Sequence, residues 1–304
     1  MAINADVLLD RIRLKNRLRL WRFLAIIFAA LLLAFFFLKD NAGFLNSIPA
    51  GNYIARVPIT GMILDNKEFI KAIEKLKKDK NVKAVILDIN SPGGTTVGGE
   101  VYYETLVDLQ KEKPLISTYG TLAASAAYLL SMPSDRIFAR KASLTGSIGV
   151  IMKAPNFGKI AEKVGYNVDL IRTGNMKGEP SPYVKMSPEV RTVFQESIND
   201  FYDVFVDIVA KHRKLSREEV VKLADGRIYT GLQASKNGLV DSIGGEKEAV
   251  KWLQENKQIS DKTPVHEVTI HRKRNLFLEL FGSILGDNSL IQKEFYNNGL
   301  LSIW

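Results

Sequence analysis

The chain has 304 residues and no cysteine, which excludes a disulfide framework, a thiolate metal site and a cysteine nucleophile. Hydrophobic residues make up 46% of the chain and charged residues 25%, a composition typical of a globular protein with a full core. The formal net charge is +9, and residues 1–22 alone hold six basic residues against two acidic ones.

An apolar run follows this basic arm. Residues 23–38 contain no charged or polar side chain, and Leu20 and Trp21 lengthen the run. At about 1.5 Å per residue the run comes close to the roughly 30 Å hydrocarbon layer of a bilayer. A cleaved signal peptide and an uncleaved transmembrane anchor are both open. The weak cleavage pattern after Leu38 favours the anchor, and the lack of a polar face disfavours a buried core helix.

The position of the basic arm predicts the topology of the chain. Basic arms can bind nucleic acid, but one that lies beside an apolar run is better interpreted as a membrane-topology signal. We therefore expect residues 1–22 in the cytoplasm, one span at residues 23–38, a linker at residues 39–52 and an extracytoplasmic remainder. The lipid bilayer is an expected partner, and nucleic acid is not.

Beyond the linker, the hydrophobic pattern predicts strands that alternate with helices. The alternation predicts an α/β fold with right-handed crossovers, in a domain at residues 53–260 that precedes a C-terminal extension at residues 261–304 with an amphipathic helix near 275–285. Strands are expected at 53–63, 83–89, 114–119, 136–139 and 167–172, and helices at 66–80, 98–112, 123–132 and 188–211.

A serine among small residues lies where a strand is predicted to meet a helix. This is Ser125, in the segment GTLAASAAY. A nucleophile at a helix start gains from backbone N–H groups that stabilise the oxyanion formed on attack. Taken alone, the pattern fits a serine that only caps or packs a tight helix start better.

A Gly-Gly turn follows the predicted buried strand at 83–89, in the segment NSPGG. Gly93 and Gly94 could aim backbone N–H groups into a cleft at the carboxyl ends of the strands. In isolation, an ordinary turn between a strand and a helix is the better interpretation.

Few residues could activate Ser125 as a base. The three histidines are His212, His266 and His271, and none lies between Ser125 and residue 211. Their positions argue against a Ser–His–Asp triad without excluding it, because a triad can take any chain order. Lysine is the other base used with serine, and it needs burial to bring its pKa down from about 10.4.

Lys177 is the lysine with the most distinctive surroundings, in the segment TGNMKG. Gly174 and Gly178 flank it and give the backbone the freedom to present the side chain inward. Without further information, a solvated loop lysine is the commoner arrangement.

Five motifs occur in one order over residues 90–245: NSPGG, GTLAASAAY, LTGSIGV, TGNMKG and ADGRIYTGLQASKNGLVDSIGG. In this order they resemble the signal peptide peptidase A family, which are Ser–Lys serine proteases of the bacterial plasma membrane. With the anchor included, the resemblance covers nearly the whole chain. It implies a Clp protease/crotonase-like ββα superhelix and an endopeptidase that degrades remnant signal peptides. It also implies a homo-oligomeric ring whose subunits share active sites.

The resemblance assigns roles to particular residues. It places the nucleophile on Ser125 and the general base on Lys177. The two backbone N–H groups of the oxyanion hole fall on Gly94 and Ala126, and the serine that orients the lysine amine falls on Ser147. No HExxH or Walker A motif is present, so we expect no metal or nucleotide cofactor and ATP-independent proteolysis.

The chain departs from the family pattern at one place. Many members have Ser-Gly-Gly where this chain has Ser125-Ala126-Ala127. The amide donor is kept, but the added methyl groups narrow the site and bear on the substrate range.

Two other functions compete with proteolysis. An acyl-CoA enzyme on a crotonase-like fold also uses a Gly-rich oxyanion hole, but it needs no Ser–Lys pair and no extracytoplasmic anchor. A membrane scaffold that has lost its chemistry is the other alternative. The presence of Ser125, Lys177 and Gly94 argues against it.

Overall fold

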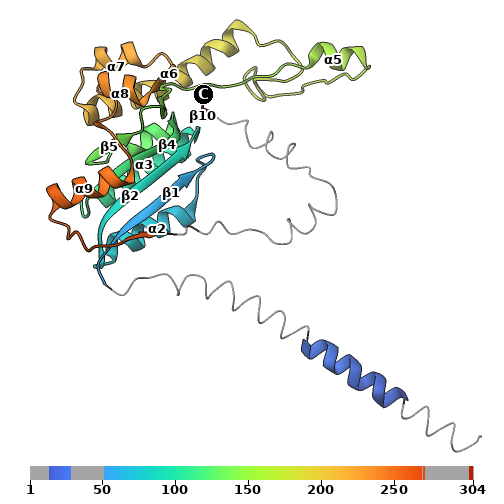
Figure 1. Cartoon of the computed structure of the whole chain (residues 1–304). Coiled ribbons are helices and arrows are strands. Elements are labelled where there is room, and N and C mark those ends of the chain that lie inside the picture. The colour runs from blue at the N-terminus through green and yellow to red at the C-terminus, as the bar shows by residue number, and fades with distance from the viewer. Residues whose placement is uncertain (1–13, 29–50, 269, 271–300, 304) are drawn as a thin grey trace, which may run out of the picture. The chain divides into compact units, whose positions relative to one another are not determined.

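The computed structural model describes residues 14–28, 51–268, 270 and 301–303, and the chain divides into two units, Met1–Ala50 and Gly51–Trp304 (Figure 1). In the first unit, residues 14–28 form an exposed α-helix. Within the described ranges, no helix is both long enough and apolar enough to span a bilayer. Most of the predicted anchor at 23–38 and the whole predicted helix at 275–285 lie outside the described residues.

The second unit alternates strands and helices, which confirms the predicted α/β class. Its strands are β1 (Tyr53–Thr60), β2 (Val82–Ser91), β3 (Gly93–Thr95), β4 (Leu115–Ala124), β5 (Arg136–Ala139), β6 (Leu144–Gly146), β7 (Ile228–Thr230), β8 (Ser242–Ile243), β9 (Val265–Glu267) and β10 (Leu301–Ile303). Its helices are α2 (Lys67–Lys78), α3 (Thr96–Gln110), α4 (Ala126–Ser131), α5 (Gly158–Lys163), α6 (Pro188–Arg213), α7 (Arg217–Leu223), α8 (Gly231–Lys236) and α9 (Glu246–Lys257).

The main sheet is mostly parallel, and β4 lies at its centre. The strand order is β7-β6-β4-β2-β1-β9, with β5 and β8 attached to β4 by a side branch. The first half of β4 pairs with β5, and its last residues, from Leu122 to Ala124, pair with β6. The change of partner falls near Gly120, where the Asn90 side chain of β2 accepts the Leu122 N–H at 3.2 Å. The end of β4, directly before Ser125, is therefore paired with a second strand, β6.

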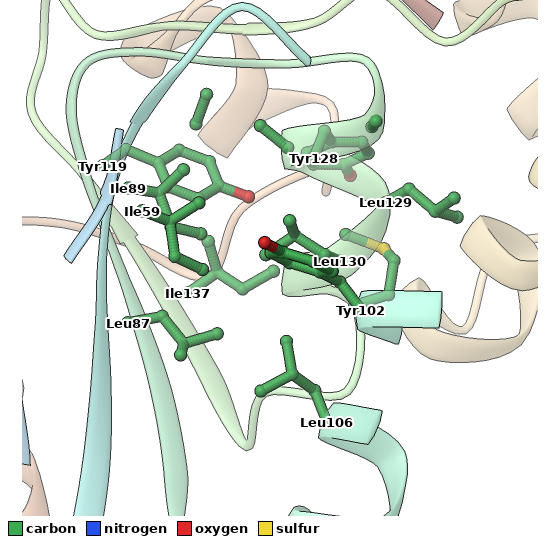
Figure 2. Packing of buried hydrophobic residues seen from close by; sticks show 14 of the residues in the cluster. Ile59, Leu87, Ile89, Tyr102, Leu106, Tyr119, Tyr128, Leu129, Leu130 and Ile137 are labelled. Carbon is green, nitrogen blue, oxygen red and sulfur yellow. The ribbon is translucent and has the colours of Figure 1, made fainter. Parts of the chain in front are cut away.

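The two faces of the sheet are covered by different helices because strand side chains alternate. Leu87 and Ile89 of β2 belong to a cluster with Leu106 of α3 and Tyr128 of α4, shown in Figure 2. Ile86 of β2 points to the other face, where it belongs to the cluster that includes α9. Helices α3 and α4 are thus anchored to the same face of the sheet.

The structure corrects two predicted elements in particular. The helix expected at 123–132 begins at Ala126, because Ala123 and Ala124 remain in β4 and pair with β6. The strand expected at 167–172 is not formed, so that prediction was wrong. A strand needs a partner for its backbone groups, and this segment has no ladder with any described strand.

The chain between the sheet and α6 is only lightly packed. Among residues 151–187, Ser181 alone is buried. Figure 1 shows α5 beyond the N-terminal end of α6, away from the sheet. This segment, residues 151–187, is called the arm below.

Candidate active site

Ser125 stands at a strained turn between β4 and α4. Its backbone has φ 56° and ψ −123°, in the left-handed half of φ space that a serine rarely adopts, and the side chain is fully buried. The Ser125 N–H donates to the Gly146 carbonyl at 2.9 Å, which ties the turn to β6. The hydroxyl makes no capping hydrogen bond to α4, so Ser125 is not the simple N-cap that its position allows. A strained strand-to-helix turn of this kind is how hydrolases present a nucleophilic serine.

Gly94 lies in β3, which is held from one side by Ile63. The Ile63 N–H donates to the Gly93 carbonyl, and the Thr95 N–H donates to the Ile63 carbonyl, both at 2.9 Å. A Cβ on residue 94 would fall 1.8 Å from the Ile63 carbonyl oxygen. Only glycine allows this close approach of the two backbones.

The backbone N–H of Gly94 points away from Ile63, because consecutive residues of a strand direct their hydrogen-bonding groups to opposite edges. At that opposite edge, β10 pairs with β3 in antiparallel register, with Ser302 opposite Gly94. The edge that carries the predicted oxyanion donor therefore accepts an extended backbone.

Ser91 fixes this strand to the end of β1. Its hydroxyl donates to the Gly61 carbonyl at 2.6 Å and accepts the Gly93 N–H at 3.1 Å, and the side chain is fully buried. The positioning role of Ser91 was not predicted from the sequence. The available signal was a serine directly before Pro-Gly-Gly, where a hydroxyl commonly caps the turn backbone.

Ala126 is the first residue of α4 and is fully buried. The N–H groups of a first helical turn have no acceptor within their own helix, so the Ala126 N–H has the character of an oxyanion donor. Helix α3 approaches closely here: a Cβ on Gly99 would lie 3.0 Å from the Ala126 methyl. Gly99 is thus a second residue that sequence reasoning missed, and α4 has no room to move toward α3.

Ser147 follows β6, two residues after Thr145, and is also buried. Its φ is 49°, and its N–H donates to the Arg227 carbonyl at 2.9 Å. The antiparallel pairing of β6 with β7 places Tyr229 against Gly146. The motif ADGRIYTG, which carried part of the family resemblance, therefore forms the support of Ser147.

Lys177 is the exception among the predicted site residues. Ser125, Ala126, Gly94 and Ser147 are buried, whereas Lys177 is exposed on the arm. Its described hydrogen bonds use its backbone, from its N–H to Gly174 and from Arg172 to its carbonyl. The isolated chain thus buries Ser125, Ala126, Gly94 and Ser147 and leaves Lys177 exposed.

The histidines with a described position lie elsewhere. The His212 Nε2 atom is 2.9 Å from the Tyr103 hydroxyl, and burial, together with the charges of Lys211 and Arg213, lowers the pKa of His212. His266 of β9 packs edge-on against Tyr53 of β1. Neither contact involves Ser125. The part of the chain that the structure describes also contains no group of three acidic or histidine side chains suited to a metal ion.

An α/β domain with a buried serine on a strained strand-to-helix turn has the architecture of a serine hydrolase. Comparison with known sequences narrows this class. The sequence profile of peptidase family S49 matches residues 107–260. A protein of Methanocaldococcus jannaschii named as a protease is 39% identical over 213 residues, which cover 70% of this chain and 68% of that protein.

Two bacterial relatives agree with this match. A protein of Enterococcus faecium named as signal peptide peptidase SppA is 36% identical over 226 residues, covering 70% of this chain and 66% of the relative. Protease 4 of Haemophilus influenzae is 33% identical over 246 residues, covering 78% of this chain but only 40% of the longer relative. The chain belongs to peptidase family S49, and it is a serine-type peptidase.

Replacing Gly94 tests the geometry of the site. In Gly94→Ala the new methyl group would collide with the Ile63 backbone, so β3 must shift and its N–H must leave the oxyanion position. We expect kcat for a fluorogenic peptide to fall by about 10²–10³-fold, the cost of losing one oxyanion donor. Gly120→Ala, whose methyl group would meet ordinary contacts from 3.4 Å, is the matched control. Unchanged kcat in a folded Gly94→Ala chain would show that the Gly94 N–H is not an oxyanion donor.

Proposed function

We propose that this chain is a membrane-anchored endopeptidase in which Ser125 is the nucleophile and Lys177 the general base, and that signal peptides released from preproteins are its substrates. The observation that carries the proposal is the strained, buried turn at Ser125, which is followed by Ala126 at the start of α4, a helix that contacts β3, the strand of Gly94. The family motifs and the relatives named as proteases support the same chemistry. A Clp protease-like superhelix remains part of the proposal.

The proposed reaction proceeds in two stages. The Ser125 hydroxyl loses its proton to the neutral Lys177 amine and attacks the peptide carbonyl, while the N–H groups of Gly94 and Ala126 stabilise the oxyanion. The lysine ammonium then protonates the leaving amine, which gives an acyl-enzyme. A water molecule, deprotonated by the same amine, hydrolyses the ester. The Ser147 hydroxyl accepts a hydrogen bond from the amine and fixes its direction.

Strand β3 supplies the place for the substrate backbone. One edge of β3 is occupied by Ile63, and the other carries the Gly94 N–H and pairs with β10. An extended peptide that takes the place of β10 on this edge brings its carbonyl groups beside the Gly94 donor by ordinary strand pairing. Recognition through the backbone suits a peptidase whose substrates share little sequence.

The dyad is tested by single substitutions. Ser125→Ala and Lys177→Ala are each expected to lower peptide hydrolysis by about 10⁴-fold or more, because the nucleophile and its base act as a unit. Lys185→Ala, which removes another exposed lysine of the arm, should keep wild-type activity. Ser147→Ala should cause a partial loss, since the hydroxyl only orients the amine. Substantial activity in folded Lys177→Ala would exclude Lys177 as the base.

The exposure of Lys177 supports a site that two subunits share. A lysine that acts as a base at neutral pH must leave water, and the arm of an isolated chain does not provide such a place for Lys177. Ser147 borders an open hollow whose walls include Asn199 of α6, Asp225 and Gly226. A lysine from a neighbouring subunit that enters this hollow would reach the Ser147 hydroxyl.

Apolar residues on the arm and on α6 support the same assembly. The arm exposes large hydrophobic side chains, and Ile171 is fully in solvent. The apolar residues of α6 are buried only at Val190, near its start, and at Phe205, Val206 and Val209, in its last third. The exposed large hydrophobic residues of the arm are Ile151, Phe157, Ile160, Val164, Tyr166, Leu170, Ile171, Tyr183 and Val184. Such a surface typically marks a contact with another protein, and a head-to-tail contact between copies closes into a ring.

Complementation tests the shared site. Ser125→Ala and Lys177→Ala chains, each inactive, are co-expressed so that mixed oligomers form. In a random mixture, about a quarter of the head-to-tail interfaces join an intact Ser125 to an intact Lys177, so about a quarter of wild-type activity should return. Co-expression of Ser125→Ala with the double variant is the matched control and should stay inactive. Verified mixed oligomers without activity would place the dyad within one chain.

The membrane topology is tested on spheroplasts, whose plasma membrane is intact. Protease added to spheroplasts should digest the chain beyond about residue 40 and spare the basic arm, as expected for a cytoplasmic N-terminus. Lysed spheroplasts serve as the control in which both parts are accessible. Protection of residues 51–268 in intact spheroplasts would overturn the proposed orientation.

A further inference from the structure

A small apolar hollow lies directly beside the candidate nucleophile. Most of its walls come from α3, α4 and α6, and Val150 adds to them. The lining includes Thr96, Glu100, Ala126, Leu129 and Phe201, and only apolar atoms face the space. Ala126 is the residue after Ser125, and Thr96 is the residue after β3. The hollow is therefore lined by residues next to or within the two backbone segments that carry the proposed oxyanion donors. No side chain in the proposed mechanism uses it.

This position matches the side chain of the substrate residue whose carbonyl is attacked, the P1 residue. The attacked carbon must lie against the Ser125 hydroxyl, with its oxygen between the N–H groups of Gly94 and Ala126. The P1 side chain leaves from the adjacent Cα, so it enters the space next to those donors. Ala126 and Thr96 both line this hollow.

The hollow is too small for most side chains. The space open to the centre of a water-sized sphere is about 20 Å³, where about 10–15 Å³ already holds one water molecule. A methyl group is of similar size to water, whereas the side chain of leucine adds three further carbon atoms. In the described conformation the hollow thus has room for an alanine side chain.

The walls resist enlargement. The Ala126 methyl lies where a glycine would leave extra space, and the close contact with Gly99 keeps α4 from moving toward α3. Leu129, on the next turn of α4, would be 3.4 Å from a Cβ on Gly99 and is nearly buried. From α6, Phe201 also lines the hollow. A larger P1 side chain must displace packed groups, at a cost in the transition state.

We propose that this hollow is the P1 pocket and that it restricts cleavage to peptide bonds that follow alanine or a residue of similar size, with Ala126 and Phe201 as specificity-determining residues. The inference rests on the proposed Ser125 mechanism and names the substrate class within it. Segments that end in small apolar residues, as signal peptides do near their cleavage site, fit such a pocket.

The test uses the full-length chain and peptidyl coumarin amides that differ only at P1, which is alanine, leucine or phenylalanine. We expect kcat/KM for alanine to exceed that for leucine by at least about 10-fold, the range in which an apolar pocket discriminates by size. Phe201→Ala enlarges the pocket. It should raise the ratio of kcat/KM for the leucine substrate to kcat/KM for the alanine substrate by about 10-fold or more. Phe194→Ala, on the same helix but outside the hollow, should leave this ratio unchanged. The oligomeric state of both variants is checked by size-exclusion chromatography.

Labelling with a fluorophosphonate separates the possible failures. If Ser125 is labelled and the leucine substrate is cleaved as well as the alanine substrate, the pocket inference is wrong while the nucleophile stands. The pocket inference is equally wrong if Phe201→Ala is folded and labelled but its ratio equals that of Phe194→Ala. If Ser125 is neither labelled nor needed for cleavage, the proposed mechanism fails, and the inference falls with it.

Discussion

The left-handed backbone of Ser125 is the constraint on which the rest of the site depends. A serine holds this conformation only when its surroundings impose it. Here β4 ends between β2 and β6, the Ser125 N–H is tied to Gly146, and α4 starts at the next residue in a fully packed position. Each of these contacts comes from a separate part of the chain. The strain at one residue is therefore supported by the packing of the sheet and of α3 and α4.

The proposed site divides into a half that one chain packs in place and a half that, in the proposed account, a second chain supplies. The first half comprises Ser125, the Gly94 strand pinned by Ser91, and Ser147 supported by the Arg227 carbonyl. In the proposed account the other half is the arm with Lys177; the arm is exposed and carries several large hydrophobic side chains. In the proposed account, assembly buries the arm and supplies the base in one step. Peptidase activity would then depend on oligomerisation, so that unassembled chains carry no active dyad.

Sequence reasoning found the elements that depend on local pattern. The amphipathic period of α2, the buried strand β2 and the turn at Gly93 and Gly94 are all encoded in short windows. It missed what depends on contacts between distant segments. The continuation of β4 to Ala124 is set by β6, the need for glycine at position 99 is set by Ala126, and the strand expected at 167–172 has no partner strand among the described residues. The site roles came from motif order rather than from any single residue, and their chemistry remains a proposal.

The most direct test of the central claim measures whether Lys177 of one subunit reaches the site of another. The chain has no cysteine, so a single pair introduced as Ser147→Cys and Lys177→Cys is free of background. Mild oxidation of the assembled protein should give disulfide-linked dimers and higher ladders on a non-reducing gel, and each single variant should stay monomeric. A disulfide closed within one chain, or no disulfide in a verified oligomer, would contradict a dyad shared between subunits.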